Sequence, residues 1–210
     1  ITLIRADACA YLDALPTEML TVNLGPSHPA SHGTLRVLLQ LDGERIVRAV
    51  PEIGYLHRGF EKSAEKGTWT EVIPYTDRMN YNSALGNNVG YCRAVETLLG
   101  VEVPPRAQAL RVICAEMARI MDHLICVGTN LVDLGALTNF WYFFNLRERF
   151  YRVVERLCGA RLTTSYARIG GLARDAYPGF ADELRAVLRE VPDALRDVRA
   201  LVERNRIYLE

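Results

Sequence analysis

The stretch PPRAQALRVICAEMARIMDHLICVG, residues 104–128, decides the fold of this chain. Its apolar residues recur at intervals of three and four positions, with polar residues between them. The apolar stripe comprises Leu110, Ile113, Met117, Ile120, Met121 and Leu124, and the polar side carries Gln108, Arg111, Arg119 and Asp122. This spacing predicts an amphipathic helix that packs against other helices. Pro104 and Pro105 at its first turn and Gly128 near its end mark its expected limits.

Further helices are predicted on either side of this one. They cover residues 57–66, 79–99, 139–158 and 181–206, the last as two polar helices that meet at Pro192. Closer to the N-terminus, alternating apolar residues predict strands at 19–24, 35–41 and 45–50. The Asp42-Gly43 pair between two of these runs is a strong hairpin signal. We therefore expect an α+β fold, in which a small N-terminal antiparallel β-sheet precedes a mainly α-helical bundle.

The expected organisation has four parts. Residues 1–18 form an N-terminal lead, and residues 19–56 form a small antiparallel β domain that holds a loop with two histidines. Residues 57–180 form the helical bundle, and residues 181–210 form polar helices.

Composition limits the possible partners. The 25 Lys and Arg residues balance the 25 Asp and Glu residues, so nothing global predicts binding to nucleic acid. No run approaches the roughly 20 apolar residues that span a bilayer, so membrane contact is expected only through other subunits. The cysteines form no C-x-x-C pair and mostly fall in apolar runs, which is typical of reduced core residues. They are Cys9, Cys92, Cys114, Cys126 and Cys158.

Two of the four histidines, His28 and His32, share the segment NLGPSHPASHG, residues 23–33. On a helix, this spacing would place both rings on one face and suggest a metal site. Pro29 lies between them and disfavours helical geometry at His28, so the sequence weakens the metal hypothesis and no metal site is predicted. A histidine on a loop is instead a natural proton donor near neutral pH.

Five segments together carry a family resemblance. They are GPSHPASHG (25–33), IGYLHRGFEK (53–62), PPRA (104–107), DLGALT (133–138) and RIGG (168–171). In this order they resemble the D subunit of respiratory complex I, the proton-pumping NADH:quinone oxidoreductase; it is also called the 49-kDa subunit. The resemblance runs from about residue 19 to residue 180. It implies a fold like that of the nickel–iron hydrogenase large subunit. The chain would correspond to the N-terminal half of the D subunit.

The resemblance also implies the site. His32 and Tyr81 match the two groups that contact the quinone head group, and Asp133 matches the carboxylate that partners the histidine. Quinone reduction places negative charge on two oxygens at opposite edges of a ring, which requires a donor on each side. An ionised Asp133 would hold the His32 ring and favour its charged form. Arg78 is expected near the terminal iron–sulfur cluster of a partner subunit. His28 either contributes to the cofactor site or only shapes the loop.

The implied partners are the other subunits of complex I. They include the subunit that holds the terminal cluster, the C subunit and the membrane-arm subunits. The substrate would be ubiquinone or menaquinone, and NADH would be used on another subunit of the complex. The implied location is peripheral, at the cytoplasmic face of the bacterial inner membrane.

Two alternatives remain, a hydrogenase-type catalytic subunit and a non-catalytic scaffold. Hydrogenases of this type hold nickel and iron partly through an Arg-x-Cys-Gly-x-Cys motif. The matching stretch is Arg78-Met79-Asn80-Tyr81-Asn82-Ser83, in which Asn80 and Ser83 occupy the cysteine positions. Amide and hydroxyl groups do not replace thiolates at such a centre, which disfavours the hydrogenase hypothesis. A pure scaffold would not need His32, Tyr81 and Asp133 together.

The chain departs from the family pattern in two respects. Many members carry a histidine near the cluster in the segment matching residues 160–166, where this chain has Thr163 and Thr164. Losing that donor predicts a lower cluster potential without pH dependence, and hence a low-potential acceptor such as menaquinone. Members are also much longer, so we expect a fragment, a truncated product or half of a split subunit. Alone, it should be inactive and should not close a complete quinone cavity.

Overall fold

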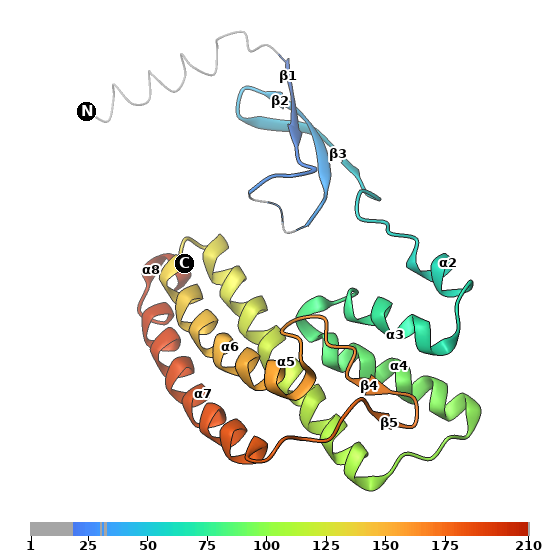
Figure 1. Cartoon of the computed structure of the whole chain (residues 1–210). Helices are drawn as coiled ribbons and strands as arrows, with labels where there is room; N and C mark the ends of the chain where they lie inside the picture. Colours follow the sequence, from blue (N-terminus) through green and yellow to red (C-terminus); the bar gives the residue numbers. More distant parts are fainter. Residues whose placement is uncertain (1–18, 30, 32, 210) are drawn as a thin grey trace. The chain divides into compact units, whose positions relative to one another are not determined.

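The computed structural model describes residues 19–29, 31 and 33–209 of the chain. The chain divides into two compact units, Ile1–Gly59 and Phe60–Glu210. The described strands β1 to β3 belong to the first unit, and the helices belong to the second (Figure 1). The fold is therefore α+β with mostly helical content, as predicted. None of the described helices is both long enough and apolar enough to cross a lipid bilayer.

The first unit contains a three-stranded antiparallel sheet. Its strands are β1 (Met19–Leu24), β2 (Arg36–Asp42) and β3 (Arg45–Glu52), in that spatial order. Asp42 pairs with Arg45 across a two-residue turn, in which Gly43 has a φ of 58°. The predicted hairpin is thus confirmed. The strand predicted to end before Pro51 continues through it, because Pro51 lies on an edge strand, where a missing N–H is tolerated.

The second unit contains the helices and two very short strands. They are α2 (Phe60–Ala64), α3 (Trp69–Asp77), the 3₁₀ turn η1 (Tyr81–Ser83), α4 (Ala84–Leu99), α5 (Pro105–Asp133), α6 (Leu137–Cys158), β4 (Ala167–Arg168), β5 (Gly171–Leu172), α7 (Phe180–Val202) and α8 (Arg206–Leu209).

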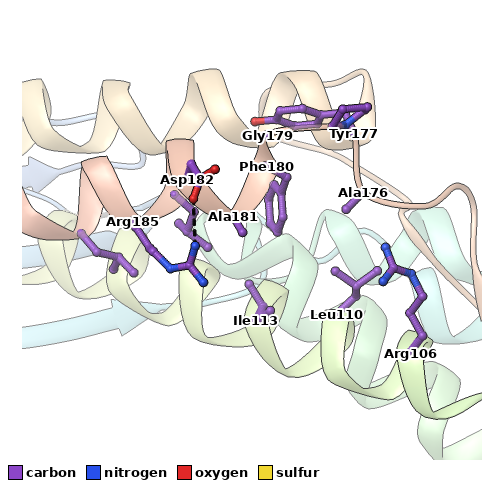
Figure 2. Close-up of a pocket in the computed structure, with 13 residues that line it drawn as sticks. Arg106, Leu110, Ile113, Ala176, Tyr177, Gly179, Phe180, Ala181, Asp182 and Arg185 are labelled. Atoms are coloured by element: carbon purple, nitrogen blue, oxygen red, sulfur yellow. Dashed lines mark hydrogen bonds and ion pairs between the residues drawn. The ribbon is translucent and has the colours of Figure 1, made fainter.

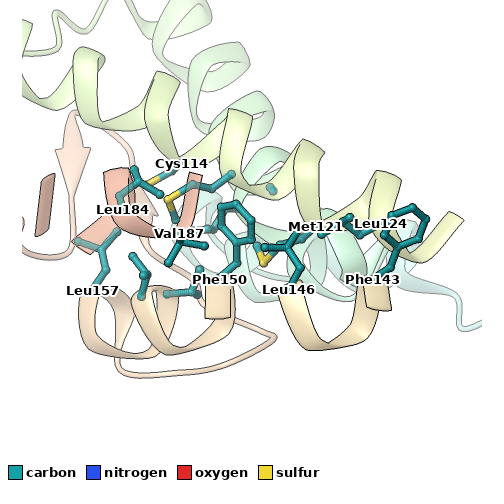
Figure 3. Packing of buried hydrophobic residues seen from close by; sticks show 14 of the residues in the cluster. Cys114, Met121, Leu124, Phe143, Leu146, Phe150, Leu157, Leu184 and Val187 are labelled. Carbon is teal, nitrogen blue, oxygen red and sulfur yellow. The ribbon is translucent and has the colours of Figure 1, made fainter. Parts of the chain in front are cut away.

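The main core lies among α5, α6 and α7. Four members of the predicted apolar stripe of α5 are buried, and Ile113 and Ile120 pack against them half-buried. Figure 3 shows these side chains meeting residues of α6 and α7. The buried stripe comprises Leu110, Met117, Met121 and Leu124, and it meets Phe143, Leu146 and Phe150 of α6 and Leu184 and Val187 of α7. The amphipathic pattern of residues 104–128 therefore does organise the bundle.

Several predicted boundaries in the bundle were wrong. The helix predicted at 57–66 covers only Phe60–Ala64, and the one predicted at 79–99 begins at Ala84. Helix α5 runs past Gly128 to Asp133, because Gly128 does not end the helix but packs against α6. A Cβ at Gly128 would lie 3.3 Å from the Phe140 ring and 3.6 Å from the Phe143 ring. Helix α7 is one helix with Pro192 inside it rather than two helices that meet there. Pro192 is on the exposed side, where water can satisfy the freed carbonyl.

Helix α3 was not predicted, since Pro74 lies inside it. A capping box at its start was the available signal. The Glu71 side chain reaches back to the start of the helix, where its Oε2 accepts from the Thr68 backbone N–H at 2.6 Å. The short helix α3 ends directly before Arg78, so it sets the start of the candidate site.

Candidate functional site

The segment from Arg78 to Ser83 connects α3 and α4 and carries Tyr81. Hydrogen bonds fix it from two sides. Asn80 Nδ2 donates to Asp122 Oδ1 of α5 at 3.2 Å, and Asn87 Nδ2 of α4 donates to the Asn80 carbonyl at 2.9 Å. Tyr81 itself is 55% exposed. The turn therefore presents a phenol from a well-anchored backbone.

Arg78 caps the C-terminal end of α3. Its guanidinium is exposed, and Nη1 donates to the Pro74 carbonyl at 2.9 Å. Arg78 and Tyr81 lie on this short segment, outside helix α4, although the sequence predicted a helix from residue 79. Asn80 and Ser83, which stand at the cysteine positions of the hydrogenase motif, hold other roles, since Asn80 bonds Asp122 and Ser83 is the N-cap of α4.

A buried carboxylate next to Arg78 was missed from the sequence. Asp77 is fully buried and accepts hydrogen bonds from the backbone N–H of Ser165, at 2.9 Å to Oδ2, and from the Ser165 hydroxyl. Ser165 has a φ of 42°, an uncommon value for a residue other than glycine. Asn88 adds a second anchor, because its Oδ1 accepts from the Tyr166 N–H at 3.1 Å. The segment with Thr163 and Thr164 is therefore tied to the end of α3.

A small cavity lies behind the Tyr81 turn. It is lined by residues of η1, α4, α5, α6 and the segment after α6. These are Tyr81, Asn82, Ala84, Leu85, Met121, Tyr151, Val154, Arg161, Leu162 and Thr164. The Thr164 hydroxyl is buried there without a hydrogen-bond partner. The cavity thus lies against the Tyr81 turn, with Tyr81 and Asn82 among the residues that line it.

Asp133 is the last residue of α5 and is exposed. The helix ends there because Gly135 adopts a φ of 84° and its N–H bonds the Val132 carbonyl at 2.8 Å. Asp133 lies eleven residues beyond Asp122, the residue that anchors the Tyr81 turn, which is about 16 Å along the helix axis. Asp133 and the residue that anchors the Tyr81 turn thus lie on the same helix, about three turns apart.

His28 lies on an exposed loop of the first unit, and its carbonyl accepts from the Ser31 N–H at 3.0 Å. The loop starts at Gly25, whose φ is 90° and where a Cβ would lie 1.9 Å from the Leu35 carbonyl oxygen, so only glycine fits. His32 lies outside the described residues. The predicted contacts of His32 with Asp133 and with a quinone therefore stay predictions.

No three His, Cys, Asp or Glu side chains gather as possible metal ligands within residues 19–29, 31 and 33–209. Two of the cysteines, Cys92 and Cys114, are buried in the apolar core. Burial raises the pKa of Cys92 to about 11 and that of Cys114 to about 12. Neither is a thiolate at neutral pH.

A separate pocket of about 500 Å³ lies between α5 and the start of α7 (Figure 2). Its walls are mainly apolar and include Leu110, Ile113 and Phe180. Two ion pairs border it, Arg106 with Asp175 at 2.9 Å and Arg185 with Asp182 at 2.9 Å. It contains none of the residues predicted for the quinone site.

Comparison with known proteins defines the class. The model of the family described as the respiratory-chain NADH dehydrogenase 49 kDa subunit matches residues 133–210. The fused C/D subunit of the NADH-quinone oxidoreductase of Bdellovibrio bacteriovorus is 56% identical over 198 residues, which are 94% of this chain and 35% of that protein. The D subunit of the Methylacidiphilum infernorum enzyme is 49% identical over 193 residues, 92% of this chain and 46% of that protein.

A third relative, the D 1 subunit of the Sorangium cellulosum enzyme, is 51% identical over 201 residues, 96% of this chain and 50% of that protein. The chain belongs to the family of NADH-quinone oxidoreductase D subunits, the 49 kDa subunits of complex I. The predicted resemblance is thus confirmed. The chain spans between 35% and 50% of the length of these three relatives.

Proposed function

We propose that this chain forms part of the quinone-reducing site of NADH:quinone oxidoreductase, next to the terminal iron–sulfur cluster of a partner subunit. The observation that carries the proposal is the geometry of Tyr81. Its half-exposed phenol lies on a turn that hydrogen bonds anchor to α4 and α5. A fixed donor with access to a ligand is what proton transfer to a quinone oxygen requires.

The proposed reaction is the reduction of a quinone to a quinol by two electrons and two protons. The electrons come from the partner's cluster, which supplies one-electron transfer. Tyr81 gives its proton to one quinone oxygen, and His32 gives a proton to the oxygen at the opposite edge. Asp133 orients His32 and stabilises its charged form.

Arg78, exposed on the same segment as Tyr81, would raise the potential of a cluster beside it.

The names of the relatives support a proposal about the partners of this chain. The Bdellovibrio relative is named as a C/D subunit, which supports the C subunit as a neighbour. We further propose contacts with the terminal-cluster subunit and the membrane-arm subunits, a peripheral location at the cytoplasmic face of the bacterial inner membrane, and a fold like that of the hydrogenase large subunit. His28 is proposed to shape the loop that holds His32.

Substituting Asp133→Asn in the full-length protein should slow quinone reduction by the assembled complex, more strongly at high pH. Without the carboxylate, the His32 ring loses its proton at a lower pH, so activity should fall off at a lower pH than in the wild type. The pH profile of NADH:quinone activity in membranes measures this shift. Glu116→Gln removes a charge from an exposed position on the same helix and serves as the control. A profile that matches the control would show that Asp133 does not set the proton donor.

The cluster potential should not depend on pH, since Thr163 and Thr164 offer no ionisable group. A redox titration of the assembled complex at several pH values measures this. Thr163→His should introduce a slope approaching about 59 mV per pH unit, the value for one proton coupled to one electron. A slope of that size in the wild type would contradict the prediction and would remove its support for menaquinone as the acceptor.

A further inference from the structure

Arg147 of α6 contacts the Tyr81 turn from behind. Its Nη2 donates to Asn82 Oδ1 at 3.0 Å, and Asn82 directly follows Tyr81. The guanidinium carbon lies 4.4 Å from the centre of the Tyr151 ring and 5.3 Å from that of Phe144. These aromatic contacts on its own helix hold the cation against the turn.

Arg147 differs from the other arginines of α6 in its ion pairing. The other three arginines of α6 each pair with a glutamate, Arg149 with Glu190, Arg152 with Glu148 and Arg156 with Glu183. Arg147 forms no ion pair within the described part of the chain, and its buried Nε atom has no hydrogen-bond partner.

Burial lowers the pKa of Arg147, while the phenols of Tyr151 and Tyr81 raise it and Arg161 lowers it further. The Tyr81 phenol is thus among the groups that interact with this charge. An apolar residue would fill the same space without a desolvation penalty. The cation must therefore be explained by something other than packing.

We propose that Arg147 is a positioning residue of the quinone site, which holds the Tyr81 turn through Asn82 and stabilises the negative charge left on Tyr81 when it gives up its proton. This inference rests on the proposed function. In the step concerned, the Tyr81 O–H bond breaks and its proton forms a bond to a quinone oxygen, while the partner's cluster is oxidised and supplies the electrons. A proton from water then restores the phenol.

Other charged and titratable groups near this turn also contribute to the electrostatic environment of Arg147 and Tyr81. Asp122 of α5 accepts from Asn80, and Tyr151 of α6 lines the same cavity. Arg161, after α6, lines the cavity too, but it pairs with Glu148 at 2.6 Å and Glu155 at 3.5 Å. Glu148 also interacts with Arg147, and this interaction lowers the Glu148 pKa, after the larger effect of Arg161.

The test uses the full-length protein in the assembled membrane complex. Arg147→Met should lower kcat for quinone reduction about tenfold or more, with little change in KM, because the charge acts when the proton is transferred. Arg147→Lys, which keeps the charge, should stay within about threefold of the wild type. Arg149→Met, on the exposed side of the same helix, should leave the rate unchanged. Reduction of an artificial acceptor upstream of the cluster reports assembly.

A double variant separates this inference from the proposed function. If Arg147 acts through Tyr81, Tyr81→Phe with Arg147→Met should be no slower than Tyr81→Phe alone. If Tyr81→Phe lowers activity and the Arg147→Met effect is additive or absent, the inference is wrong and the proposed function stands. If Tyr81→Phe has no effect, the proposed function is wrong. Should Arg147→Met prevent assembly, Asn82→Ala, which breaks the contact from the other side, should lower kcat at least threefold; an unchanged rate would overturn the inference.

Discussion

Tyr81→Phe in the full-length protein should lower the quinone-reduction kcat of the assembled complex about 100-fold or more. Loss of a positioned general acid costs about this factor, since the proton must then come from a less favourable donor. The KM for quinone should change little, because the phenol contributes when charge develops rather than when the ring binds. The ring stays in place in this variant, so the anchored turn is preserved.

Steady-state NADH:quinone kinetics measure this prediction, and reduction of the terminal cluster by NADH shows that electrons still arrive. Tyr142→Phe is the matched control, because Tyr142 is also a partly exposed tyrosine, at 41%, but lies on α6 outside the small cavity. A Tyr81→Phe complex with nearly wild-type quinone reduction would show that the site has been assigned to the wrong residue.

Arg111→Leu should lower the free energy of unfolding by about 3–5 kcal/mol. The Arg111 and Glu96 side chains are 4% and 6% exposed and are joined by two hydrogen bonds of 2.7 Å and 2.6 Å. Arg111 also donates to the carbonyls of Arg168 and Gly171, at 2.6 Å and 2.9 Å. Removing it leaves a buried carboxylate unpaired and two carbonyls of the β4–β5 hairpin without this donor.

Denaturant unfolding followed by circular dichroism measures the loss. Arg119→Leu breaks the exposed pair with Glu116 and should change stability by less than about 1 kcal/mol. The double substitution of Glu96 and Arg111 by leucine should be more stable than Arg111→Leu, because no charge is left buried. Equal effects of the Arg111 and Arg119 substitutions would contradict the assigned importance of the buried pair.

The same pair predicts the direction of a pH effect. Burial raises the pKa of Glu96, but Arg111 and the Gly170 N–H lower it more, so the pKa lies below its ordinary value. A carboxylate with a lowered pKa stabilises the folded state above the pKa of the unfolded chain, about 4.3, and loses that contribution as the pH falls through the folded pKa. At acid pH, the free energies of unfolding of the wild type and of Arg111→Leu should therefore differ less than they do at neutral pH.

The sequence predicted those features that depend on local patterns. The apolar stripe of α5 and the Asp42-Gly43 turn are periodic or local signals, and both structures were confirmed. Gly128 was misread because a glycine that ends a helix and one that admits a neighbouring helix look alike until the neighbour is known. The helix predicted over residues 79–99 begins only at Ala84, and Tyr81 lies on the 3₁₀ turn before it.

The supporting contacts could not be predicted. Arg147 and Asn82 are 65 residues apart, and Glu96 and Arg111 are polar residues in helices whose partners the pattern does not specify. Their positions depend on how α4, α5 and α6 pack, which is a property of the tertiary structure. The side chains that hold the Tyr81 turn are therefore found only in the folded structure.

The contact of Asp77 with Ser165 also determines the order in which parts of this unit can fold during synthesis. The two residues are 88 positions apart. A ribosome adds about 5–20 residues per second, so the start of the candidate site emerges several seconds before the residue that anchors it. Until then Asp77 has no Ser165 to bind. Co-translational folding of this unit can therefore build α4 and α5 early, but the end of α3 reaches its final form only after α6 has been made.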